Sequence, residues 1–361
     1  MLPNFFYHPR ILSYDFGPRH PLKPERLNRT IRLLEALGQV EFIDPGPGRR
    51  EDAERMHSVD YVSAVEHISC GFPVPQGLHL RHGIGTLDNP AFEGMFEASL
   101  AYLAATVRAA EAVRDGANLA FSIGGGLHHA QRDRASGFCI FNDPAIAVQI
   151  LRERFERVAY VDIDVHHGDG VQALWYDDPT VMTCSIHQDG RTLYPGTGHV
   201  FETGAAFTSV NVPLMPKTTG DVWVWAFDYG ILPALEAFQP EAIVLQLGTD
   251  AHALDPLAHL DVSAQEWLHA VRRVRDFGVP IVATGGGGYN LGTVPRMWVA
   301  ACLALAGLEV PEVLPKHLAE EWQVPKFFDD VLPGPEGSGM DDAKSAVTWL
   351  NKNLLPNIPR P

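Results

Sequence analysis

The stretch Asp162-Ile163-Asp164-Val165-His166-His167-Gly168-Asp169 concentrates groups that can do chemistry. It follows an apolar run, 157–161, that predicts a buried strand. Alternate side chains of an extended segment share a face, so Asp162, Asp164 and His166 are expected to point the same way. Two carboxylates and an imidazole on one face suit a divalent cation, and without one they are costly to bury. The motif therefore predicts a metal site rather than a set of salt bridges at a strand end.

Three glycine-rich motifs each follow a strand-like run of their own. They are Gly124-Gly125-Gly126-Leu127-His128-His129 after 119–123, Gly248-Thr249-Asp250 after 242–247, and Gly285-Gly286-Gly287-Gly288-Tyr289-Asn290 after 281–284. Ligands of open α/β sheets gather outside the carboxyl ends of the strands, and glycine permits a close approach of the backbone. The four motifs are therefore expected to meet at one edge of a sheet.

Strand-like and helix-like runs alternate along the chain, which predicts an α/β fold with a largely parallel central sheet and helices on both faces. We expect a helix that starts at Asn89-Pro90, and a long loop over 71–89. The other expected helices span about 142–155, 221–238, 263–277 and 293–307. The expected strands span about 157–163, 180–186, 208–213, 242–248 and 280–284.

The apolar pattern weakens after about residue 312. We expect a single catalytic domain over 1–315 and a C-terminal extension over 316–361 that packs on or near it. Within the extension, 333–339 reads as a turn or linker, and 343–355 predicts a short helix.

Composition narrows the class of protein. The formal net charge of −16 disfavours direct binding to nucleic acid, which depends on Lys and Arg. No apolar stretch is long enough for a transmembrane helix, and the N-terminus lacks the basic start and apolar core of a signal peptide. The four cysteines are scattered, which is typical of reduced thiols. We expect a cytoplasmic protein without membrane or nucleic-acid partners.

In combination, the motifs resemble the metal-dependent histone deacetylase superfamily. They occur in the family's order, together with Gly137-Phe138-Cys139, and the resemblance covers roughly residues 5 to 310. Asp169 is similar to the class I pattern, and so is His20-Pro21-Leu22-Lys23-Pro24-Glu25-Arg26. The bacterial acetoin-utilization deacetylases are the group that the chain resembles most. The resemblance implies the single-domain arginase/deacetylase-like fold, with the active site at the carboxyl ends of the strands.

The resemblance also implies a role for each motif. Asp164, His166 and Asp250 would bind one catalytic cation, which we expect to be Zn²⁺, with Fe²⁺ as the alternative. Tyr289 would donate a hydrogen bond to the oxyanion that forms when water attacks an amide. The proton-transfer groups would be two histidine–aspartate pairs, namely His128 with Asp162 and His129 with Asp169.

Further residues match the family's substrate tunnel. Gly137, Phe138 and Tyr194 would form its walls, and Leu257 and Asp88 would lie at its rim. Arg26 corresponds to an arginine of the inner channel. Tyr194 stands where the family usually has Phe, and Leu127 where class I enzymes often have Trp. A structural K⁺ ion is also expected, bound through Asp162, Asp164, His166 and Ser185.

These features predict an enzyme that hydrolyses the acetamide of N-acetyl-lysine on proteins or peptides. The main alternative is an amidohydrolase for acetylated polyamines or another small amide, which would use the same chemistry. A two-metal ureohydrolase related to arginase is disfavoured because no second Asp-x-His-x-Asp block is present. A module that binds acetyl groups without cleaving them is disfavoured by the full set of His128, His129 and Tyr289. The sequence selects neither a native substrate nor an oligomeric state.

Overall fold

The fold is built on one central sheet. The computed structural model describes residues 2–71, 77–331 and 333–360. Its eight strands lie in the order β2-β1-β3-β8-β7-β4-β5-β6, and every described pair of neighbours is parallel, as predicted. The strands are β1 (Leu2–Phe6), β2 (Val40–Ile43), β3 (Leu119–Ser122), β4 (Val158–Asp162), β5 (Val181–Gln188), β6 (Ser209–Leu214), β7 (Ala242–Gln246) and β8 (Ile281–Thr284).

The four strands that precede the chemical motifs are neighbours in the order β3-β8-β7-β4. All residues of these strands are buried, as expected for a parallel sheet that is covered on both faces. Because parallel strands end at the same edge, the loops that follow these four strands are brought together. The local sequence predicted a common edge, and the strand order makes the four loops adjacent.

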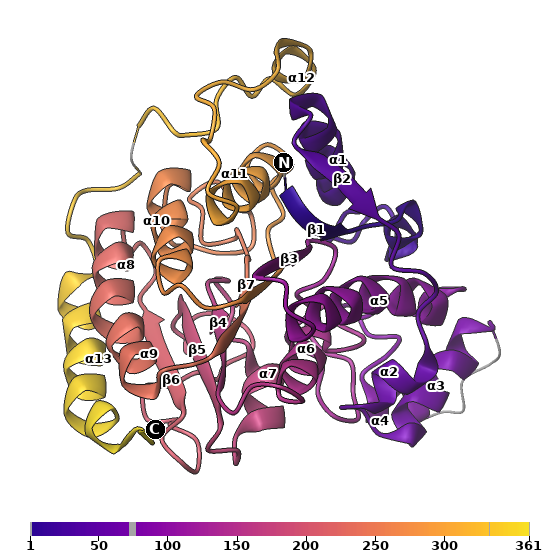
Figure 1. Cartoon of the computed structure of the whole chain (residues 1–361), viewed down its shortest axis with the longest axis horizontal. Coiled ribbons are helices and arrows are strands. Elements are labelled where there is room, and N and C mark those ends of the chain that lie inside the picture. The colour runs from indigo at the N-terminus through magenta and orange to yellow at the C-terminus, as the bar shows by residue number, and fades with distance from the viewer. Residues whose placement is uncertain (1, 72–76, 332, 361) are drawn as a thin grey trace.

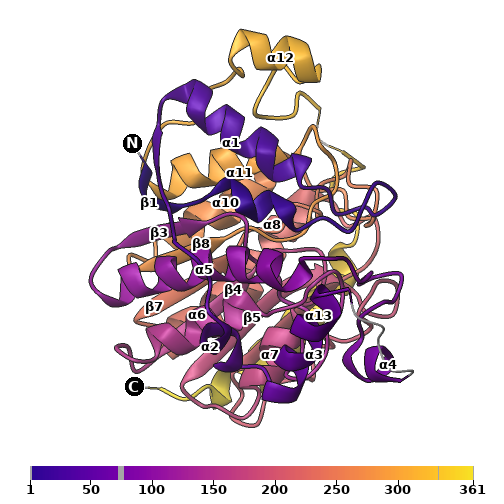
Figure 2. The same cartoon turned by 90° about the vertical axis from the view of Figure 1, so that its right-hand side faces the viewer.

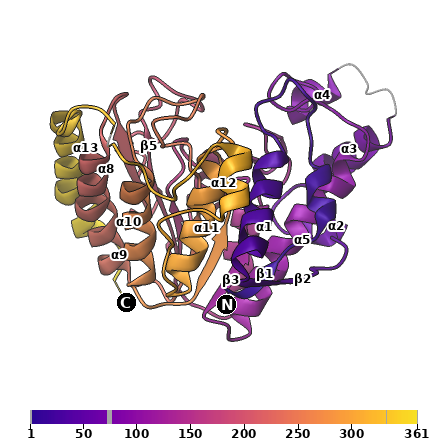
Figure 3. The ribbon, with the colours of Figure 1, turned by 90° about the horizontal axis from the view of Figure 1, so that it is seen from above.

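Helices cover both faces of the sheet (Figures 1 and 3). One layer comprises α1 (Glu25–Leu37), α8 (Gly220–Ala226), α9 (Leu232–Phe238), α10 (Ala264–Arg275), α11 (Val294–Leu305) and α13 (Met340–Asn353). Within this layer α1 contacts α11, α11 contacts α10, α10 contacts α8, and α8 contacts α13. The other layer comprises α5 (Met95–Arg114), α6 (Asp143–Leu151) and α7 (Asp169–Trp175).

A smaller group of helices lies beside α5 (Figure 2). It consists of α2 (Arg50–Glu54), α3 (Val59–Ser69) and α4 (Leu78–His82). Short 3₁₀ helices occupy Pro9–Ser13 and Leu355–Asn357, and a π-helical turn, Phe227–Ile231, joins α8 to α9. No helix in the described ranges is both long and apolar enough to cross a membrane.

Two predictions for residues 71–107 need correction. The helix does not begin at Asn89-Pro90; α5 begins at Met95, after Gly94, whose φ is +78°. Asn89 instead belongs to a turn, in which its N–H bonds to the Thr86 hydroxyl and its carbonyl accepts from Gly85 N–H. The expected loop 71–89 contains α4, while 72–76 lie outside the described residues.

The C-terminal segment packs on the sheet-bearing part of the chain. Helix α13 contacts β6 and α8. Helix α12 (Lys316–Trp322) lies at the end of α1, where the Trp322 ring is 5.4 Å from the Arg29 guanidinium and 5.6 Å from that of Arg32. Asp329, also in this segment, accepts a hydrogen bond from Arg296 Nη2 at 2.6 Å. Its carboxylate also lies 3.0 Å from His252 Nε2.

Asp329 is expected to make the protein less stable at acidic pH. Burial alone would raise the pKa of Asp329, but bonds from His252 and Ala264 N–H and the charge of Arg296 outweigh it and hold the pKa well below its usual range. The stabilisation is therefore present above the unfolded-state pKa of about 4 and is lost as pH falls below it.

Urea unfolding of the metal-free protein between pH 6 and pH 3 measures this dependence. Asp329→Asn should lower the free energy of unfolding at pH 6 and flatten its decline toward pH 3. Asp330→Asn, at the exposed neighbouring position, should change neither the free energy of unfolding at pH 6 nor its decline toward pH 3. An unchanged pH slope in Asp329→Asn would contradict the assignment.

Candidate active site

The predicted metal ligands converge from two adjacent strand ends. Asp164 and His166 follow β4, and Asp250 follows β7. His166 Nδ1 lies 3.1 Å from Asp164 Oδ1 and 3.1 Å from Asp250 Oδ2. One ligand atom from each residue lies within 4.8 Å of the others, and all three residues are buried.

The electrostatics of this group fit a cation. Burial and the adjacent Asp164 carboxylate raise the pKa of Asp250 to about 7. Two buried carboxylates that repel each other are stable as anions only with a positive charge between them. Oxygen and imidazole-nitrogen donors are suitable ligands for Zn²⁺ and for Fe²⁺.

The loop geometry differs from the expected alternation along an extended strand. Strand β4 ends at Asp162, whose side chain turns toward the histidines, and Asp164 and His166 lie beyond it in a loop. Carboxylates accept the N–H groups of this loop: Asp162 from Asp164 at 3.0 Å, Asp164 from His166 at 2.9 Å, and Asp250 from Val165 at 2.9 Å. These bonds replace strand geometry beyond Asp162, while Asp162 and Asp164 both lie beside the His128 ring, at 2.7 and 4.0 Å.

Asp164 accepts two further hydrogen bonds, one from β7 and one from the loop after β8. Gln246 Nε2 donates to Asp164 Oδ2 at 2.8 Å, and Gly287 N donates to the same oxygen at 2.7 Å. A Cβ on Gly287 would lie 2.0 Å from Asp250 Oδ2, so this glycine is needed for the close approach. We did not single out Gln246 from the sequence, although a lone polar side chain in the apolar run 242–247 was its signal.

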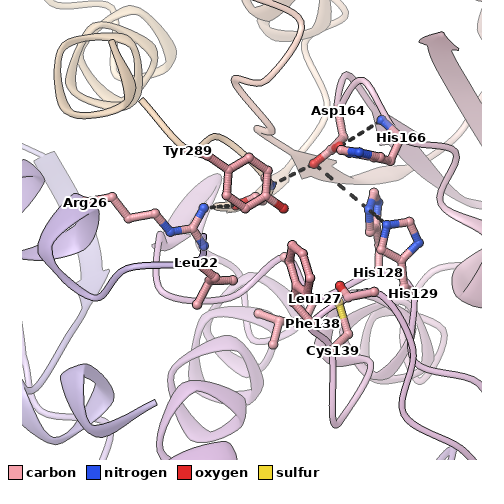
Figure 4. A pocket seen from close by; sticks show the side chains of 14 residues that line it. Leu22, Arg26, Leu127, His128, His129, Phe138, Cys139, Asp164, His166 and Tyr289 are labelled. Atoms are coloured by element: carbon pink, nitrogen blue, oxygen red, sulfur yellow. Dashed lines mark hydrogen bonds and ion pairs between the residues drawn. The ribbon is translucent and has the colours of Figure 1, made fainter. Parts of the chain in front are cut away.

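The two histidines lie side by side, each against an aspartate. His128 Nδ1 is 2.7 Å from Asp162 Oδ2, and His129 Nδ1 is 2.7 Å from Asp169 Oδ1. The two Nε2 atoms are 3.1 Å apart, and Figure 4 shows both rings beside Asp164 and His166. An imidazole whose Nδ1 is held by a carboxylate presents Nε2 for proton transfer.

The neighbours of the two rings have opposite effects on their pKa values. Burial lowers the pKa of His128, but Asp162 and Asp164 outweigh burial and raise it to about 9. Burial and the adjacent His128 lower the pKa of His129 to about 4. Pairs of titratable groups with separated pKa values are typical of acid–base sites.

Three supporting residues of the histidine pair were not predicted. Tyr160 Oη donates to Asp162 Oδ2 at 2.6 Å, and Gln131 Nε2 donates to Asp169 Oδ2 at 2.9 Å. Asp143, at the start of α6, accepts from Gly126 N at 2.9 Å and from Leu127 N at 2.9 Å. These contacts fix the glycine-rich loop that carries the histidines.

Tyr289 faces this group from the loop after β8. Figure 4 shows its ring between Arg26 and the Asp164–His166 pair. Arg26 Nη1 donates to Gly286 O at 2.7 Å and to Gly288 O at 3.0 Å, and its guanidinium lies 6.0 Å from the Tyr289 ring. Arg26 therefore braces the tetraglycine loop from the inner side.

Two connected spaces reach the site. The inner one, of about 20 Å³, is lined by Leu22, Arg26, Leu127, Cys139, the histidines, Asp164, His166 and Tyr289, among others. The outer one, of about 220 Å³, is lined by Asp88, His129, Gly137, Phe138, His166, Leu193, Tyr194, Leu257 and Tyr289. The residues predicted for the tunnel walls and rim thus line one space. Leu193 of the outer space, and Leu22 and Cys139 of the inner one, were not assigned to the tunnel from the sequence.

The walls of the outer space are aromatic and closely packed. The Tyr194 ring stands edge-on to His129 at 5.1 Å, and the Phe138 ring stands edge-on to Tyr289 at 5.8 Å. A Cβ on Gly137 would lie 2.4 Å from His129 Cδ2, which explains why glycine occupies that position. The outer space is thus lined by the aromatic rings of Phe138, Tyr194 and Tyr289 together with His129 and His166.

Ser185 lies beside Asp162, since the two are paired across β5 and β4. Its hydroxyl oxygen is 2.7 Å from His187 Nδ1. Binding of K⁺ by Asp162, Asp164, His166 and Ser185 stays a prediction.

The ligand set predicts about one equivalent of divalent metal per chain. Asp250→Ala is expected to abolish binding, because it removes one donor and leaves two. Metal analysis of protein purified without chelator measures the stoichiometry. Asp261→Ala, which removes a carboxylate paired with Lys217, should retain the full equivalent. Two tightly bound metals per chain would contradict the single-site assignment.

Comparisons with known proteins point to one family. A model of the histone deacetylase domain matches residues 20–305. The chain is 37% identical over 334 residues to the acetoin utilization protein AcuC of Bacillus subtilis, covering 88% of this chain and 86% of that protein. It is 35% identical over 337 residues to histone deacetylase clr6 of Schizosaccharomyces pombe, covering 91% and 83%. The crystal structure of an HDAC homologue from Aquifex aeolicus superposes with a TM-score of 0.89 at 30% identity, over 96% of this chain and 98% of that one.

Proposed function

The chain belongs to the histone deacetylase family of hydrolases, and we propose that its substrate is N-acetyl-lysine on a protein or peptide. The observation that carries this proposal is the outer space. Its aromatic walls, Phe138 and Tyr194, suit the methylenes of a lysine side chain, and it leads to His129, His166 and Tyr289. A long side chain would thus present its acetamide to the polar end.

We propose that Asp164, His166 and Asp250 hold one divalent cation, Zn²⁺ in preference to Fe²⁺. The cation, when bound, lowers the pKa of water and polarises the acetyl carbonyl. The proposed K⁺ ion would be structural. The free thiols Cys139, Cys184 and Cys302, all buried, support a cytoplasmic enzyme.

The histidine pair supplies the proton transfers of the proposed reaction. His129 lines both spaces, and its Nε2 side accepts a proton from the attacking water. The proton then returns to the departing lysine amine. Asp162 and Asp169 orient the two rings, whose Nε2 atoms are 3.1 Å apart.

Tyr289 stabilises the negative charge that develops on the acetyl oxygen. Burial and the Asp250 and Asp164 carboxylates raise the pKa of Tyr289 well above its usual value. The hydroxyl therefore stays protonated and can donate a hydrogen bond. Donation is stronger at the charged oxygen than at the ground-state carbonyl, so it favours the transition state.

The rim and the inner space complete the proposal. Exposed Asp88 would accept from the backbone of the substrate, and Leu257 would contact its flanking part. Arg26 would assist the departure of acetate through the inner space. Residues 1–315 would form the catalytic domain, and 316–361 an extension that packs on it.

A panel of substrates tests the proposal. Acetyl-lysine peptides should exceed acetylspermidine and acetylputrescine in kcat/KM by at least tenfold, which corresponds to about 1.4 kcal/mol of differential transition-state binding. The physical reason is the proposed contact of Asp88 and Leu257 at the rim with the backbone and flanking part of a peptide, which the polyamines lack. Metal-reconstituted protein is assayed on each substrate, with the Asp250→Ala variant as the blank. Faster hydrolysis of the acetylpolyamines would favour the small-molecule alternative.

A further inference from the structure

A buried carboxylate joins two residues that the proposed reaction uses. Asp255 lies in the loop between Asp250 and Leu257 and is 7% exposed. Its Oδ1 accepts from Leu257 N at 3.0 Å, and its Oδ2 accepts from Tyr289 N at 2.7 Å. Oδ1 therefore holds Leu257 at the rim of the outer space, and Oδ2 holds Tyr289, the proposed oxyanion donor.

Tyr289 needs such an external anchor. It follows four glycines, and Gly288 has φ +127°, so the backbone before it is conformationally permissive. The tetraglycine loop contacts the loop after β7 through Thr249 N to Gly287 O at 2.9 Å and Asn290 Nδ2 to Leu254 O at 3.0 Å. These bonds flank Tyr289, whereas Asp255 bonds to the N–H of Tyr289 itself.

A charged side chain at this place has an electrostatic cost. Burial and the neighbouring Asp164 carboxylate both disfavour the ionised form of Asp255. An amide of the same shape would avoid this cost. It has only one acceptor oxygen, however, so its NH₂ group would face either Leu257 N–H or Tyr289 N–H. Only a carboxylate can accept from both residues in this arrangement.

We propose that Asp255 is a positioning residue that couples the substrate rim at Leu257 to the oxyanion donor Tyr289. The proposal rests on the proposed function, because it takes Tyr289 as the oxyanion donor. A substrate that displaces Leu257 at the rim moves the same carboxylate that sets the backbone of Tyr289. The Asp255 side chain thereby links substrate contact with Leu257 at the rim to stabilisation of the oxyanion by Tyr289.

The variant Asp255→Asn tests the coupling, and Asp52→Asn is its matched control. Asp52 is also buried, but it is paired with Arg49 on α2, which packs against α3 and α5. We expect Asp255→Asn to lower kcat about 10- to 100-fold, the scale of a small misplacement of a catalytic group. KM should change less, and the metal content should stay at one equivalent. Asp52→Asn should leave kcat unchanged.

A double-mutant cycle separates positioning from general damage to the fold. In a Tyr289→Phe background, Asp255→Asn should cost little further kcat, because the hydroxyl that it positions is already absent. An equal loss in both backgrounds, or full activity of Asp255→Asn alone, would overturn the proposal.

Amide hydrogen exchange provides a readout that needs neither metal nor substrate. In the metal-free protein, the N–H of Tyr289 should exchange faster in Asp255→Asn than in the parent or in Asp52→Asn. Unchanged exchange at Tyr289 would overturn the coupling. If the parent fails to hydrolyse acetyl-lysine peptides, the proposed substrate is wrong, while the exchange experiment still decides whether Asp255 holds Tyr289.

Discussion

Replacing Tyr289 by Phe is expected to lower kcat on acetyl-lysine peptides by about 10²–10³-fold, the usual cost of losing one oxyanion donor. The change keeps the ring, which packs edge-on to Phe138 and lies near the Arg26 guanidinium. It removes only the hydroxyl, which buried carboxylates keep protonated. The metal content should not change, because Tyr289 is not among the predicted ligands.

Steady-state kinetics with metal analysis measure this effect. Binding of a hydroxamate inhibitor should weaken far less than turnover, because that ligand gains most of its affinity from the metal. Tyr229→Phe is the control, since Tyr229 is 56% exposed and its ring stacks on Trp225. Retention of most activity by Tyr289→Phe would mean that the metal alone stabilises the oxyanion.

The sequence could predict that the candidate site residues meet at one edge of the sheet, because most of them lie directly after strands. A run of buried apolar residues followed by glycines identifies a strand end locally, and parallel strands end at one edge. The order β3-β8-β7-β4, which makes the loops of His129, Asp164, Asp250 and Tyr289 adjacent, is set by long-range packing. No local pattern specifies it. The resemblance to the histone deacetylase family implied one active site at the carboxyl ends of the strands but no strand order, and the family itself is confirmed by the comparisons.

The supporting residues were missed because each is a single polar side chain without a periodic pattern, and of these only Gln246, in an apolar run, left a signal. Gln246 closes an apolar strand, and Asp143 lies at the start of a helix, where a capping role is the ordinary interpretation. Asp255 lies in an irregular loop, and its two partners are far apart in sequence from one another. The predicted start of α5 was also wrong, because a local signal was overridden by a turn. Asn89-Pro90 is a strong helix-start signal, but Asn89 lies in a turn with Gly85 and Thr86 instead.

Replacing His129 by Ala should lower kcat by about 10²–10⁴-fold, the usual contribution of general acid–base catalysis. His129 lines both spaces, whereas His128 lines only the inner one, so His129 is the ring nearer the incoming substrate. Its loss would remove the proposed acceptor for the proton of the attacking water. Asp169 would remain without its imidazole partner, and the metal ligands would remain complete.

A matched histidine–aspartate pair elsewhere in the chain supplies the control. His269 Nε2 lies 3.0 Å from Asp228 Oδ2 on the surface of α10, so His269→Ala removes a similar contact without touching the site. It should leave kcat unchanged. His129→Ala should retain one equivalent of metal, which separates loss of proton transfer from loss of the cation.

The double variant His128→Ala/His129→Ala tests whether the two rings act as a unit. Their Nε2 atoms are 3.1 Å apart, so the charge on His128 affects proton uptake by His129. Residues that act together give losses that do not add, and the double variant should therefore be little slower than His129→Ala alone. Additive losses would mean that each histidine carries a separate step. Activity of His129→Ala within tenfold of the parent would assign the proton transfer to His128 and leave His129 as a wall of the outer space.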